Sequence, residues 1–164
     1  MQEQNPNHVY VDMMVDVLRH KRSILKQLLQ MTKKQESLLK EDDLDQEVFN
    51  MLVDEKGLQI DELNDIDEGF DSLFRRVKSE IIPNREKYRD QIRQMQELIA
   101  EVSDLGVSVQ ALERQNSERF KAYLVRERQK IHDFHVNRKS ASTYYQNMSN
   151  THRSHQSYFF NETK

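Results

Sequence analysis

The stretch FNMLVDEKGLQIDELNDIDEGFDSLFRRVKSEIIPN, residues 49–84, carries apolar side chains at a spacing of about 3.5 residues, which predicts one long amphipathic helix. The stripe ends at Pro83, because proline removes a helical hydrogen bond and clashes with the preceding turn. Asn84 follows and is a suitable N-cap for another helix. The stripe consists of Phe49, Leu52, Ile60, Leu63, Ile66, Phe70, Leu73, Val77 and Ile81.

Similar stripes lie on both sides of this stretch. The one before it runs from Val9 to Leu39 and is broad, and Asn5-Pro6-Asn7 supplies its N-cap. The segment EDDLD, residues 41–45, interrupts the pattern and can cap the second helix through Asp43 or Asp45. The stripe after it is the longest and runs from Tyr88 to Phe134.

These stripes predict an all-α protein, an antiparallel bundle of three long helices at about 8–40, 45–82 and 84–136. Short connections favour antiparallel neighbours, so we expect the first two helices to form a hairpin and the third to fold back along the second. Residues 1–136 then form the bundle. Residues 137–164 form a loosely ordered polar tail with an aromatic end.

The predicted helices differ in length, about 55 Å for the second and about 78 Å for the third at 1.5 Å per residue. The third helix therefore reaches the turn at 41–45 near residue 122 and extends beyond the bundle after about Arg126. This overhang carries Ile131, Phe134 and Val136 among basic residues. An apolar stripe of this kind needs a cover, which the tail, a second copy of the chain or a partner protein can provide.

Two aromatic groups interrupt the polar tail and are candidate anchors. The first is Tyr144 and Tyr145, with Met148 nearby, and the second is Tyr158, Phe159 and Phe160. They can cap the chain's own third helix, a second copy or a partner.

Composition excludes several classes of protein. The chain has no cysteine, which removes disulfides and thiolate metal sites. The N-terminus lacks the pattern of a signal peptide and no apolar run has membrane-spanning length, so we expect a cytoplasmic protein without stable membrane insertion. From Glu41 to Asp71 thirteen acidic residues accompany one lysine, and from Arg119 to Lys139 seven basic residues accompany two acidic ones. We interpret this asymmetry as two complementary parts of one bundle and expect no nucleic-acid partner.

The sequence predicts no enzyme, no cofactor and no metal site. His132 with His135, and His152 with His155, have a spacing that can share a metal, but neither pair has the third ligand that a site needs. Gly57, Gly69 and Gly106 each lie inside a helical stripe, which indicates close helix contacts or soft points rather than phosphate cradles.

The hairpin resembles a known family. Gln35-x-x-Leu38-Leu39, the acidic turn, and Phe49-x-x-Leu52-Val53-Asp-Glu-Lys56-x-x-x-Ile60-x-x-Leu63 are similar to the helical hairpin of bacterial flagellar export chaperones of the FlgN type, and the likeness covers about residues 9–136. It implies a cytosolic bacterial holdase that binds C-terminal helical segments of hook-filament junction subunits, prevents their premature assembly and delivers them to the type III export apparatus. In that family the C-terminal part of the last long helix is the substrate-binding side.

Because the same helix overhangs here, we expect it to bind the partner through its apolar face. The residues of this face are Leu112, Phe120, Tyr123, Leu124, Ile131, Phe134 and Val136. The alternative function is a coiled-coil module that dimerises or scaffolds through the overhang.

Overall fold

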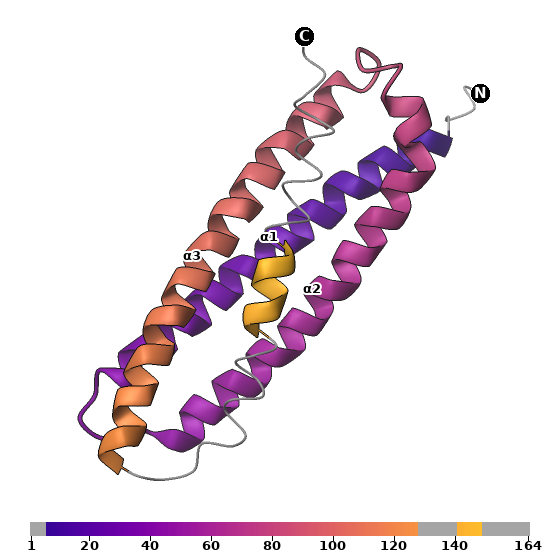
Figure 1. Ribbon diagram of the computed structural model, residues 1–164. Coiled ribbons are helices and arrows are strands. Elements are labelled where there is room, and N and C mark those ends of the chain that lie inside the picture. The colour runs from indigo at the N-terminus through magenta and orange to yellow at the C-terminus, as the bar shows by residue number, and fades with distance from the viewer. Residues whose placement is uncertain (1–5, 128–140, 149–164) are drawn as a thin grey trace.

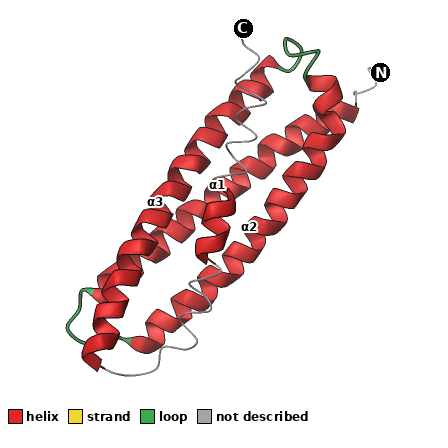
Figure 2. Cartoon of the chain, viewed as in Figure 1, coloured by secondary structure: helices red, strands yellow, loops and turns green. Residues whose placement is uncertain are grey.

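The computed structural model describes residues 6–127 and 141–148. Three long helices lie along one another, α1 (Pro6–Leu39), α2 (Gln46–Ile81) and α3 (Arg89–Glu127), as Figure 1 shows. A short helix, residues 141–148, lies between α2 and α3 in this view and in Figure 2. The described residues contain no strand, and the predicted all-α bundle of three long helices is confirmed.

Local side-chain chemistry sets the helix ends. Asp45 caps α2, because its carboxylate accepts a hydrogen bond from the Val48 backbone nitrogen at 3.2 Å. The third helix begins at Arg89, later than the predicted 84. The reason is that Asn84 serves the preceding helix, where its amide nitrogen donates to the Glu80 carbonyl oxygen at 2.8 Å. A turn over residues 82–88 then precedes α3.

The first helix is the centre of the bundle. Close backbone contacts join α1 to α2 and α1 to α3, whereas α2 and α3 have none with each other. The third helix therefore meets the second through side chains, such as the stacked rings of Phe49 and Phe120, and not through close backbone packing. The broad apolar stripe of α1 explains this arrangement, because it presents buried residues to both neighbours.

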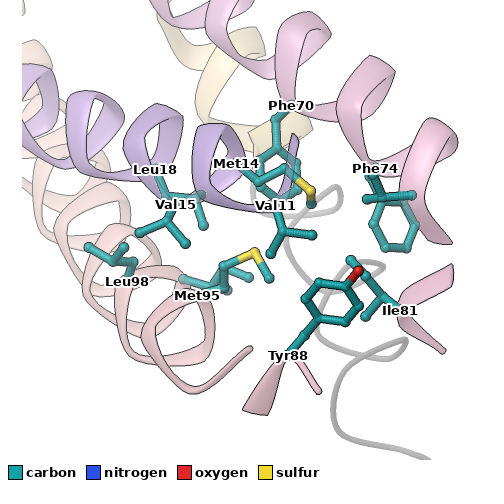
Figure 3. Packing of buried hydrophobic residues seen from close by; sticks show 12 residues of the cluster. Val11, Met14, Val15, Leu18, Phe70, Phe74, Ile81, Tyr88, Met95 and Leu98 are labelled. Atoms are coloured by element: carbon teal, nitrogen blue, oxygen red, sulfur yellow. The ribbon is translucent and has the colours of Figure 1, made fainter. Parts of the chain in front are cut away.

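The buried apolar side chains form three clusters along the bundle. The first lies near the α2–α3 turn and is centred on Tyr88 and Met95 (Figure 3). The second, which we call the central cluster, joins the three long helices to the short helix. The third, the end cluster, lies at the α1–α2 turn and contains Leu39, Leu44, Phe49, Phe120 and Leu124.

A buried polar layer also crosses the bundle. Lys56 of α2 forms an ion pair with Glu113 of α3 and donates to the Gln35 side-chain oxygen at 2.7 Å. Asn116 donates to the Thr32 carbonyl oxygen at 3.0 Å. Burial lowers the pKa of Lys56 to about 7. Since mismatched helices would leave these groups unpaired, the layer helps to fix the register of the three helices.

The charges of the acidic stretch also meet α1. Glu62 lies 2.9 Å from the His20 ring nitrogen, and Asp67 lies 2.5 Å from the Lys21 ammonium. Arg119, from the basic stretch, pairs with Glu36 of α1 at 3.1 Å. Residues of both stretches thus find partners on the helix that lies between them.

No helix of the described ranges is long and apolar enough to cross a membrane.

Candidate functional site

The short helix 141–148 turns one apolar face toward the bundle. Its residues Ala141, Tyr144, Tyr145 and Met148 have the i, i+3, i+4, i+7 spacing of an amphipathic helix, and all four are buried. The intervening serine, threonine, glutamine and asparagine residues are exposed. A segment that the polar composition assigned to a loosely ordered tail is therefore a packed helix.

An isolated helix of this length is not stable in water, because nucleation costs more than so few hydrogen bonds return. Packing against the bundle must supply the difference. Tyrosine and methionine contribute most of that packing, since large apolar surfaces dominate burial energies. The site is thus a surface that stabilises a short amphipathic helix.

We call the bundle residues that share the central cluster with this helix, together with Asp67 and Gly106, the docking surface. All three long helices contribute to it. Its apolar members are Ile24, Leu25 and Leu28 from α1, Ile60 and Leu63 from α2, and Val102 and Val109 from α3.

Asp67 of α2 is the polar contact of the docking surface. One of its carboxylate oxygens accepts from Tyr144 Oη at 3.4 Å, and the other accepts from Lys21 Nζ at 2.5 Å. Lys21 is 1 % exposed, and burial lowers its pKa, while Asp67 opposes that shift. Burial and the nearby negative charge of Asp67 raise the pKa of Tyr144, so this hydroxyl remains a donor at neutral pH.

Gly106 of α3 lies beside Met148 of the short helix. A Cβ atom at this position would overlap the methyl group of Met148 and lie 3.6 Å from its sulfur. Nothing lies within 4 Å of a Cβ built at Gly57 or Gly69. Of the three glycines that interrupt the helical stripes, Gly106 is therefore the one whose missing side chain makes room for a neighbour.

The fit of the short helix is incomplete at Tyr145. Its side chain is 1 % exposed, yet its hydroxyl has no hydrogen-bond partner among the described residues. Burial raises its pKa. A buried hydroxyl without a partner costs about 1–3 kcal/mol, so this residue weakens the docking that its ring otherwise favours.

A small hollow adjoins the docking surface. Its lining combines apolar side chains of the three long helices with the Lys21–Asp67 pair. These apolar residues are Val17, Leu18, Ile66, Phe70 and Ile99. The hollow shares Asp67 with the Tyr144 contact and is a small internal space beside the docking surface.

The residues predicted to bind a partner divide into two groups. Phe120 and Leu124 lie in the end cluster, 7 % and 8 % exposed, where Phe120 stacks on Phe49 with ring centroids 5.2 Å apart. Both were predicted to contact a partner, and in the structure they pack against residues of the α1–α2 turn and the start of α2. Tyr123 is half-buried and its hydroxyl accepts from Gln46 at 2.8 Å, and Leu112 is also half-buried.

The remaining predicted residues lie outside the described ranges. They are Ile131, Phe134 and Val136 of the overhang, Tyr158, Phe159 and Phe160 of the chain end, and the four histidines at 132, 135, 152 and 155. Within the described ranges, no group of three or more histidine, cysteine, aspartate or glutamate side chains could hold a metal ion.

Tyr144 and Tyr145, predicted as tail anchors, are buried in the central cluster, and the sequence did not indicate which residues they would contact. Asp67 looks like any other carboxylate of the acidic stretch. The spacing of Ala141, Tyr144, Tyr145 and Met148 was the available signal for a helix, and the surrounding polar residues concealed it.

Fold and site together define a helical bundle whose central surface holds a short amphipathic helix. Comparisons of the chain with models of known protein families, with curated proteins and with solved structures find no match.

Proposed function

We propose that the protein is a chaperone for helical segments, a holdase that binds an amphipathic helix of a partner protein on its docking surface. The observation that carries this proposal is the occupant of that surface. A short helix with an apolar face, which cannot be stable alone, is held there by three longer helices.

The partner we propose comes from the resemblance of the hairpin to flagellar export chaperones of the FlgN type. It is the C-terminal helical segment of a hook-filament junction subunit, held in the bacterial cytoplasm until delivery to the type III export apparatus. The binding site differs from the one that the resemblance implies, because Phe120 and Leu124 of the last long helix are used inside the bundle. The docking surface replaces them as the proposed contact.

In this proposal the chain's own helix 141–148 occupies the site in the absence of a partner and is displaced on binding. The thirteen residues 128–140 that precede it can span at most about 45 Å. Gly106, beside Met148, lies 21 residues from the end of α3, about 32 Å along the helix. The short helix can therefore reach its site within one molecule. Because displacement costs free energy, we expect partner affinities near micromolar rather than nanomolar.

The test uses fluorescently labelled peptides from the C-terminal segments of junction subunits, titrated with the full chain. We expect saturable binding, and a loss of at least about tenfold with Gly106→Leu, because the new side chain fills the space of the bound helix. Gly69→Leu is the matched control, since a Cβ at that position of α2 has no neighbour within 4 Å. The absence of binding by every junction peptide, with circular dichroism showing a folded protein, contradicts the proposed function.

A further inference from the structure

Besides its apolar packing, the docking surface makes two contacts with its helix that differ in chemistry. Asp67 accepts a hydrogen bond from Tyr144, and Gly106 leaves space for Met148. Tyr144 and Met148 are four residues apart, so one face of a helix presents both. Two specific contacts one helical turn apart can therefore discriminate between helices that carry different side chains at these two positions.

The Asp67 contact requires a donor. Lys21, itself buried, holds the second oxygen of the carboxylate at 2.5 Å, which restricts the orientation of Asp67. Hydrogen bonds to an ionised acceptor are stronger than those between neutral groups, and an acceptor left unpaired on a covered surface is costly. A helix with phenylalanine at this position loses the bond, and one with a carboxylate is repelled.

The Gly106 contact requires a long, unbranched side chain. The Met148 methyl group occupies the space that a Cβ on residue 106 would take. A β-branched side chain is wide close to its own backbone and is restricted in χ1, so it cannot extend into this space as methionine does. A short side chain leaves the space empty, which costs packing energy.

We propose that the docking surface selects partner helices with a hydroxyl-bearing aromatic residue followed four positions later by an unbranched apolar residue. A second aromatic residue directly after the first and a small residue three positions before it complete the pattern, as in Ala141-x-x-Tyr144-Tyr145-x-x-Met148. The partner class is an amphipathic helix with this pattern and without an acidic residue at the tyrosine position. This selectivity rests on the proposed function and names its substrate class.

The test uses a labelled synthetic peptide of residues 138–151 of this sequence. The receptor is the full chain with Tyr144→Ala and Tyr145→Ala, which releases its own helix. We expect Tyr144→Phe in the peptide to weaken binding about fivefold, the effect of one long hydrogen bond to a carboxylate. Met148→Ala in the peptide should weaken binding about tenfold, the effect of losing most of a buried side chain.

A substitution on the receptor, combined with the Met148→Ala peptide, isolates the contribution of the Gly106 contact to binding. On a receptor that also carries Gly106→Ala, the methionine and alanine peptides should bind within about twofold of each other, because the new methyl group removes the space that methionine used. Gly69→Ala on the same receptor is the control and should preserve the tenfold difference. Equal ratios on the Gly106→Ala and Gly69→Ala receptors, or peptide affinities insensitive to Tyr144→Phe, overturn the proposal. So does a folded receptor that binds no peptide.

Hydrogen exchange on the full chain with its own helix intact tests the same contacts without a peptide. Tyr144→Phe and Gly106→Ala should each accelerate exchange of residues 141–148 by about fivefold, and unchanged exchange in both overturns the proposal.

The experiments can contradict the proposed function and the proposed selectivity separately. If tail peptides obey both contacts while junction peptides do not bind, only the proposed function is contradicted. If junction peptides bind and lose affinity with Gly106→Leu, but tail peptides bind equally well with and without the Tyr144→Phe and Met148→Ala changes, only the selectivity is contradicted.

Discussion

At the scale of single residues, the buried polar layer makes stability depend on pH. Burial lowers the pKa of Lys56 to about 7 from 10.5, so between these values the unfolded chain binds more protons than the folded protein. The free energy of unfolding should therefore rise with pH across this window. We expect urea denaturation to show a rise from about pH 7.5 to 9.5 that is smaller in Lys56→Met, by up to about 2 kcal/mol. Exposed Lys26→Met is the control, and equal slopes in wild type and Lys56→Met contradict the prediction.

Substitution by phenylalanine should have opposite effects at the neighbouring residues Tyr144 and Tyr145 on the docking of helix 141–148. Tyr145→Phe removes a buried hydroxyl without a partner, so it should strengthen docking of helix 141–148 by about 1 kcal/mol and slow hydrogen exchange there about fivefold. Tyr144→Phe should accelerate exchange, because its hydroxyl donates to Asp67. Faster exchange in Tyr145→Phe would indicate that this hydroxyl has a favourable role after all.

At the scale of elements, the stacked pair Phe49 and Phe120 joins the start of α2 to the end of α3. Phe120→Ala should lower the free energy of unfolding by about 3–5 kcal/mol, because a buried aromatic ring is replaced by a cavity. Val125→Ala, on the same helix but 79 % exposed, should change it by less than about 0.5 kcal/mol. Similar small effects in urea denaturation would mean that Phe120 is not part of the core.

Each kind of element could be predicted to a different degree. The second helix was predicted within a residue or so of its observed ends, because its period, Asp45 and Pro83 are all local signals. The start of α3 was misplaced because Asn84 has the chemistry to cap either helix, and only the folded turn directs it to Glu80. Helix 141–148 was missed because eight residues with half their number polar carry too weak a period.

At the scale of the whole molecule, the short helix supports the middle of the bundle. It shares the central cluster with α2 and α3, which make no close backbone contacts with each other. Tyr144→Ala with Tyr145→Ala should therefore accelerate amide exchange by about tenfold near Leu63 and Val109. Amides near Phe49 and Tyr88, in the other two clusters, should be unaffected. Uniform acceleration along α2 and α3 would show that the short helix stabilises the fold globally rather than locally.

The sequence by itself determined the helical class, the number of long helices and their breaks, because helical period, proline and capping residues act over a few neighbouring positions. Only the tertiary structure decided that α1 lies between the other two long helices and that Phe120 and Leu124 belong to the core. It also decided that Asp67 and Gly106 meet a helix that begins at residue 141. These contacts join residues far apart in the chain, and a local period specifies which face of a helix is apolar but not which surface covers it.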